Sequence, residues 1–252
     1  MARLRVGTCS WKYPSWAGLV YSRPDGIDYL AEYARKYSTV EVDQWFWTLA
    51  PSPADVERYR AAVPGEFRFT VKAPNALTLV HAPGKKGAEP VPNPRFLSTA
   101  ALGSFLAGLE PLRPQVGAVM FQFGYLNRKM VASQPAFLEA LDRFLGDAPA
   151  GWPFAVEIRN AGWLDRPFFE LLRSHRTGAV LLQGYWMPPV AEVYERVGEL
   201  LEGPVVVRLH GPDRGGMEEK AGGAWDRIVE PRDAELETVA AVVRRLLKGG
   251  HD

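Results

Sequence analysis

The sequence alternates between short apolar runs and longer segments with helical periodicity, and this rhythm restricts the possible folds more than any other feature. Seven short runs have the length and composition of buried strands, at 5–11, 39–46, 67–73, 116–123, 154–160, 179–185 and 205–210. Helical segments follow them at 25–37, 53–63, 96–109, 134–145, 165–175, 190–201 and 234–248. Strict alternation of this kind is typical of a parallel sheet covered by helices.

Seven strand–helix units in 252 residues favour one TIM-like (β/α) barrel over an open doubly wound sheet. No domain boundary interrupts the pattern, so we predict a single α/β domain over 1–252. A complete barrel has an eighth strand, but here only His251 and Asp252 follow Gly250. We therefore predict that the eighth strand is missing and that the seam is open or covered by a second copy of the chain. The alternative is that a segment such as 227–230 fills part of the gap.

Polar side chains recur near the carboxyl ends of the predicted strands. Because side chains on a strand alternate between two faces, Val156 and Ile158 share one face while Glu157 and Arg159 share the other. Five further strands carry polar residues opposite their apolar face, namely Glu41, Asp43, Lys72, Gln122, Gln183, Arg208 and His210. The carboxyl ends of barrel strands meet at one mouth, where barrel enzymes have their active sites. We therefore predict the functional site at this mouth.

The charged members of this polar set are balanced in number. The acidic members are Glu41, Asp43 and Glu157, and the basic members are Lys72, Arg159 and Arg208. Charges inside a barrel are costly unless they pair, so we predict ion pairs between these two groups, with Asp43 supporting its neighbours.

The Gly-rich stretch 211–224 follows the seventh predicted strand and is predicted to be a loop. Barrels often bind phosphate near their seventh and eighth strands, and glycines allow backbone N–H groups to surround an anion. We therefore assign Asp213, Arg214 and Lys220 to substrate binding. The alternative for this stretch is a flexible surface loop.

Several of these residues belong to short motifs that occur in a fixed order. The motifs are GTCSW at 7–11, VEVD at 40–43, FRFTVKAP at 67–74, FQ at 121–122, VEIR at 156–159 and RLHG at 208–211. In this order they resemble the motifs of the YecE-like family, which is catalogued as domain of unknown function 72, over essentially the whole chain. The resemblance implies a TIM-like barrel and no established reaction. Family members usually continue into a last strand with paired asparagines, and this chain departs from that pattern.

The first functional hypothesis is an enzyme, a hydrolase, lyase or isomerase, that acts on a sugar phosphate, a phosphodiester or another anionic substrate. Basic side chains are suited to hold the anion, and carboxylates and histidines are suited to transfer protons. The predicted catalytic residues are Glu41, Glu157 and His210. The predicted substrate-binding residues, besides those of 211–224, are Trp11, Lys72, His81, Gln122, Arg159, Gln183 and Arg208.

Two alternatives remain open. One is a metal-dependent hydrolase or isomerase, because Glu41, Glu157, His210 and Asp213 include types of metal ligand. No cofactor is predicted otherwise, so a divalent metal belongs to this alternative alone. The other is a non-catalytic module that binds nucleic acid or protein through its tryptophans and a small basic loop, His81 with Lys85 and Lys86.

Composition and charge limit the binding partners and cellular compartments that the chain requires. The formal net charge is +1, with 30 basic and 29 acidic residues, so the overall charge requires neither a nucleic acid nor a membrane surface. No run approaches the roughly 20 apolar residues of a membrane helix. The lone Cys9 cannot form an internal disulfide, so the fold needs no oxidising compartment. We expect a cytoplasmic protein that binds no membrane.

Overall fold

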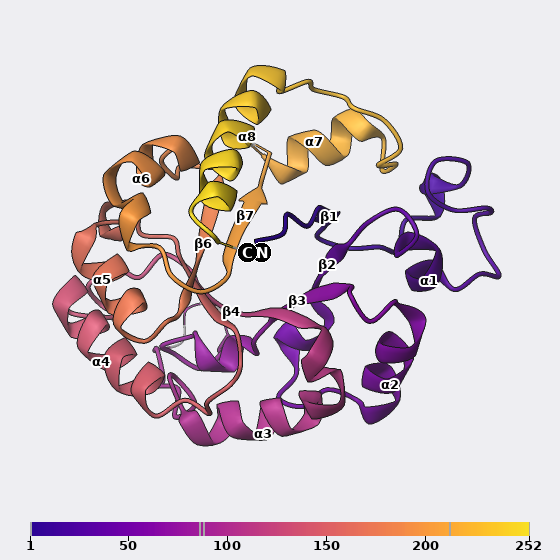
Figure 1. Cartoon of the computed structure of the whole chain (residues 1–252). Helices are drawn as coiled ribbons and strands as arrows, with labels where there is room; N and C mark the ends of the chain where they lie inside the picture. The colour runs from indigo at the N-terminus through magenta and orange to yellow at the C-terminus, as the bar shows by residue number, and fades with distance from the viewer. Residues whose placement is uncertain (1, 86, 88, 212, 252) are drawn as a thin grey trace.

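The structure, a computed structural model, describes residues 2–85, 87, 89–211 and 213–251. Parallel strands in chain order form one seven-stranded sheet that curls into an open barrel, with helices around the outside (Figure 1). The strands are β1 (Gly7–Thr8), β2 (Thr39–Val42), β3 (Arg68–Lys72), β4 (Val116–Phe123), β5 (Phe154–Ile158), β6 (Gly178–Gln183) and β7 (Val205–Leu209). The predicted α/β architecture is confirmed, as a barrel that is open and not closed.

The helices agree with most of the predicted segments. They are α1 (Tyr29–Tyr33), α2 (Pro53–Ala62), α3 (Thr99–Leu109), α4 (Gln134–Gly146), α5 (Arg166–Ser174), α6 (Val190–Val197), α7 (Arg214–Ala221) and α8 (Asp233–Lys248). Side-chain caps fix several starts; the Asp165 carboxylate, for example, accepts a hydrogen bond from the backbone N–H of Phe168. Ser52 precedes α2 as predicted, but its side chain makes no capping hydrogen bond.

The sheet ends at β1 and β7, and no described residues pair these two strands. β1 is shorter than the predicted strand 5–11, and its two residues, Gly7 and Thr8, pair with Thr39 and Val40 of β2. The segment 227–230 forms no strand, so the alternative in which it fills the gap is wrong. The open seam is confirmed within the described chain, and its cover by a second copy stays a prediction.

The prediction of a loop over 211–224 was wrong, because this stretch contains α7. The Asp213 carboxylate accepts hydrogen bonds from the N–H groups of Gly215 at 3.2 Å and Gly216 at 2.7 Å, which caps the helix start. Gly222 ends the helix in the left-handed conformation, with φ of 63°. The two caps offset the weak helix propensity of the glycines inside the first turn.

The inside of the barrel has two layers. Ala118, Met120, Ala155 and Val180 form a small buried cluster against Val206, separate from the large core between sheet and helices. Because side chains alternate, the residues two positions further along these strands lie on the same inner face and nearer the mouth. These residues include Gln122, Glu157 and Arg208, so a polar layer lies above an apolar floor.

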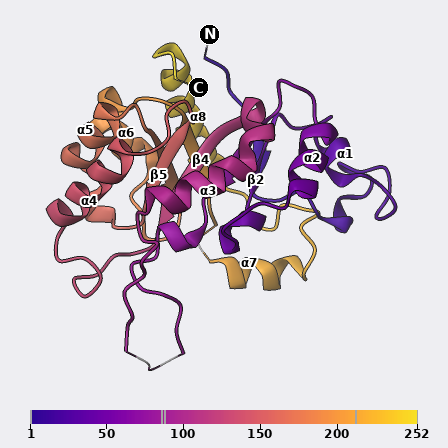
Figure 2. The same cartoon turned by 90° about the horizontal axis from the view of Figure 1, so that it is seen from below.

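The two ends of the barrel differ in what borders them. Figure 2 shows α7 and the long loop 74–94 at one end, with both ends of the chain at the other. The end with α7 is the mouth, because α7 and this loop follow the carboxyl ends of β7 and β3. In the described part of the chain, no helix combines the length and the apolar character needed to span a bilayer.

Candidate active site

Arg208 is the centre of the polar layer. Its Nε and Nη2 donate to the two carboxylate oxygens of Glu41, both at 2.8 Å, in a bidentate pair. Its Nη1 donates to Glu157 at 2.6 Å and to the Gln122 side-chain oxygen at 3.1 Å. Arg208 on β7 therefore joins β2, β4 and β5 across the barrel, and its pair with Glu41 connects the two sides of the open seam.

The other two cations complete the predicted ion-pair network. Lys72 Nζ lies 3.1 Å from Glu41 and 2.8 Å from Asp43. Arg159 Nε donates to Glu157 at 2.9 Å. The predicted pairing of three acidic with three basic side chains is therefore what the structure shows.

Burial sets the electrostatics of this network. Glu157 is 1% exposed and Arg208 8% exposed, so little water screens their charges. Burial alone lowers the pKa of Arg208, but the charges of Glu41 and Glu157 outweigh it and raise that pKa above its usual value. Burial raises the pKa of Glu41, against the opposing effect of Arg208 and Lys72. Both carboxylates have their oxygens occupied by cationic donors, which makes them poor candidates for proton transfer.

Two groups at the mouth keep free hydrogen-bonding capacity. The Nη1 and Nη2 groups of Arg159 donate to no described residue, and the side chain is 21% exposed. The half-buried His210 imidazole likewise has no hydrogen-bond partner among the residues that the structure describes. Burial, followed by the charge of Arg208, lowers the pKa of His210 to about 4, although Glu157 acts in the opposite direction. His210 is therefore neutral near pH 7 and able to accept a proton.

Tyr185 connects these two groups, and the sequence reasoning missed it. Its ring packs on the His210 ring with the centroids 4.9 Å apart, and the Arg159 guanidinium lies 5.9 Å from the Tyr185 centroid. Tyr185 has a left-handed backbone with φ of 53°. The preceding Gly184 has φ of 118°, and a Cβ there would lie 2.4 Å from the His210 carbonyl oxygen. A glycine directly after a strand was the only sequence signal for this turn.

A small cavity of about 230 Å³ lies beside the network, between the loop after β1 and the end of β2. Trp11, Lys12, Glu41 and Asp43 are among the residues that line it. Trp11 is buried and packs edge-on against Tyr59, so its ring is part of the core as well as a wall of this cavity. The assignment of Trp11 to substrate binding stays a prediction.

Gln183 has structural partners instead of a place in the ion-pair network. Its side-chain oxygen accepts from the Val190 N–H at 2.9 Å, and its side-chain nitrogen donates to Glu235. Gln183 therefore connects the end of β6 with the start of α6 and with α8. The predicted role of this amide in substrate binding is untested.

The other predicted residues also lie outside the network. Asp213 caps α7, and Lys220 is paired with Glu230 at 2.6 Å. The backbone of His81 pairs with that of Pro92 in an isolated antiparallel β-bridge. This bridge lies in the long connection after β3, which extends away from the barrel (Figure 2). Lys86, Asp252 and the Arg214 side chain lie outside what the structure describes. Within the described residues, no group of three or more His, Cys, Asp or Glu side chains is placed to hold a metal ion.

Comparisons with known proteins agree on one family. A family described as "Protein of unknown function DUF72" matches residues 5–252. A DUF72 family protein from Thermotoga maritima MSB8 is similar in structure, with a TM-score of 0.63, 21% identity, and coverage of 97% of this chain and 87% of that one. Another from Enterococcus faecalis V583 has a TM-score of 0.56, 20% identity, and coverage of 87% and 80%. At these identities the likeness shows the fold alone. No curated protein matches the chain.

Proposed function

The chain belongs to the DUF72 family, and we propose that it is an enzyme that acts on a small anionic substrate, such as a sugar phosphate or a phosphodiester, at the mouth of the barrel. One observation carries this proposal. Two groups, the neutral imidazole of His210 and the guanidinium of Arg159 with its free N–H groups, both lie against the ring of Tyr185. A group that accepts protons therefore lies next to a group that binds oxyanions.

The roles divide between the buried and the accessible parts of the mouth. Arg208 donates four hydrogen bonds, to Glu41, Glu157 and Gln122, so it holds the barrel together and positions its neighbours. Arg159 uses only its Nε to donate to Glu157, and its Nη1 and Nη2 groups bind the anionic group of the substrate. His210 accepts a proton from the substrate or from an attacking water. The sequence predicted Glu41, Glu157 and His210 as catalytic residues, and this division leaves proton transfer to His210 alone.

The test is turnover of a panel of sugar phosphates and phosphodiesters, followed by phosphorus NMR. We expect Arg159→Ala to lower kcat/KM for the substrate found by about 10-fold to 150-fold, because one charged hydrogen-bonding group is worth roughly 1.5–3 kcal/mol. The matched control is Arg166→Ala, which removes an exposed arginine paired with Glu170 on α5 and should leave kcat/KM unchanged. Turnover of no panel member, or equal turnover by Arg159→Ala and the wild type, would contradict the proposal.

A further inference from the structure

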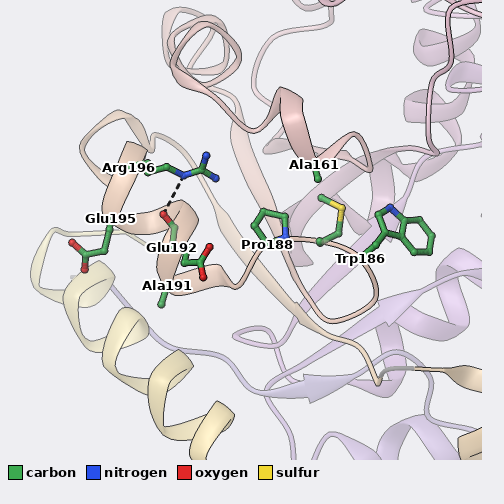
Figure 3. Close-up of a pocket in the computed structure, with 8 residues that line it drawn as sticks. Ala161, Trp186, Pro188, Ala191, Glu192, Glu195 and Arg196 are labelled. Atoms are coloured by element: carbon green, nitrogen blue, oxygen red, sulfur yellow. Dashed lines mark hydrogen bonds between the residues drawn. The ribbon is translucent and has the colours of Figure 1, made fainter.

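A larger cavity of about 700 Å³, wide open to solvent, lies beside the mouth, between the carboxyl ends of β5 and β6 and one face of α6 (Figure 3). Its lining is mainly apolar, from Ala161, Trp186, Met187, Pro188 and Ala191. Small-molecule sites are typically concave, apolar and roughly 300–1,000 Å³ in volume. The cavity is therefore large enough for one ring system.

The cavity and the mouth are built from the same two strand ends. Arg159 belongs to the mouth, and Ala161, two residues later, lines the cavity. Tyr185 packs on His210 in the mouth, and its neighbour Trp186 lines the cavity. The Trp186 indole N–H also donates to the Arg159 carbonyl oxygen at 3.4 Å. A ligand bound at Arg159 therefore has the cavity next to it.

Trp186 offers a flat surface to a ligand in this cavity. Its side chain is among the most exposed large apolar groups, with 61% of the residue accessible. The hydrogen bond of its indole N–H and the packing of its ring on Tyr185, with centroids 5.5 Å apart, hold the side chain in place. A fixed and exposed indole is suited to stack on a planar ring, because aromatic rings attract one another in offset arrangements.

Charged side chains lie at one end of the cavity. Glu192 and Glu195 lie at the end away from Trp186, with Pro188 between (Figure 3). Arg196 at the same end directs its Nε to the Glu192 backbone oxygen. Glu195 is itself paired with Arg245, so the charges at that end are largely balanced, and the apolar lining nearer Trp186 is left to contact the uncharged part of a ligand.

We propose that this cavity binds the ring of a substrate whose anionic group is bound at Arg159, so that the substrate is an anionic ester of an aromatic or heterocyclic group. The inference rests on the anion-binding role proposed above for Arg159. It adds a specificity-determining residue, Trp186, which the enzyme needs for affinity toward the ring and not for affinity toward the anion.

The test compares two probes of equal charge, methyl phosphate and phenyl phosphate, by calorimetric titration at pH 8 and constant ionic strength. We expect the wild type to bind phenyl phosphate about twofold to tenfold more tightly than methyl phosphate, which is the strength of one aromatic contact. Trp186→Ala should remove this preference and leave methyl phosphate affinity unchanged. Trp186→Phe retains a ring and should retain the preference. Trp47→Ala, which removes an exposed tryptophan outside the cavity, should behave as the wild type.

The outcomes separate this inference from the proposed function. Equal affinity of the wild type for the two probes, or equal weakening of both probes by Trp186→Ala, would overturn the inference and leave anion binding at the mouth intact. If the wild type bound neither probe, both the inference and the proposed function would be wrong.

Discussion

Arg208→Met is expected to lower the free energy of unfolding at pH 7 by about 3–5 kcal/mol, as is typical when one partner of a buried ion pair is removed. Arg208 donates four hydrogen bonds to Glu41, Glu157 and Gln122. Methionine fills similar space but leaves two buried carboxylates without their main counter-charge. It also removes the ion pair that connects the two sides of the open seam. Urea unfolding followed by circular dichroism measures the loss.

The pH dependence distinguishes this electrostatic cause from lost packing. Burial raises the pKa of the Glu41 carboxyl, and Arg208 opposes that rise. Without Arg208 this pKa rises further in the folded state, so folding takes up a proton as the pH falls. The deficit relative to the wild type should therefore be full at high pH and shrink as the pH falls toward about 4.3, the ordinary value for a glutamate. Arg166→Met, which removes an exposed arginine paired with Glu170, should unfold at nearly the same urea concentration as the wild type. An equal loss in the two variants, or a deficit independent of pH, would contradict the assignment of Arg208 as the centre of the network.

His210→Gln is expected to lower kcat on the substrate identified in the panel by about 10²-fold to 10⁴-fold, the usual contribution of one general acid or base. Glutamine is neutral and similar in size, so binding at Arg159 and the packing against Tyr185 should largely persist. The measurement is kcat and KM for the variant and the wild type. His175→Gln is the matched control, because this histidine is paired with Asp142 at 2.6 Å on the outside of the barrel, and its kcat should not change.

The sign of the pH effect follows from the lowered pKa of His210. The imidazole acts as a base only when it is deprotonated, so the wild-type kcat/KM for a phosphodiester, whose own charge is constant in this range, should stay level through pH 6 and fall only as the pH approaches about 4. An ordinary histidine would give this limb near pH 6.5. Activity that falls with a midpoint near 6.5, or His210→Gln with wild-type kcat, would remove His210 from the reaction.

The inner polar layer was predictable from the sequence because strand periodicity alone places it. Glu157 follows Val156 and precedes Ile158, so its side chain faces away from the helices wherever the strand begins or ends. The same argument placed Lys72 and Arg208, and the need to neutralise buried charge then predicted that acidic and basic side chains pair. Which side chains pair was not predictable, because Arg208 reaches Glu41 across 167 positions of sequence.

The remaining features depend on contacts that no local pattern encodes. Tyr185 and Trp186 follow the end of β6 in a left-handed turn, so strand parity does not apply to them. α7 was not predicted because two glycines, which are weak helix formers, follow Arg214. The one sequence feature before them that indicates a helix start is Asp213, which caps α7. Gln183 lies at a position of β6 where strand alternation predicts a polar side chain in the inner layer. Its amide instead forms hydrogen bonds with the Val190 N–H at the start of α6 and with Glu235.

The most direct test of the account is a phosphate titration of the histidine ring signals by nitrogen-15 NMR at pH 7 and constant ionic strength. The chain has 4 histidines, and the His210 signal is the one that His210→Gln removes. The account predicts that phosphate shifts the His210 ring signal in a saturable way, and that Arg159→Ala abolishes the shift while the neutral ring signal persists. A His210 signal that phosphate leaves unchanged, or that shifts equally in Arg159→Ala, would contradict an anion site at the mouth of the barrel.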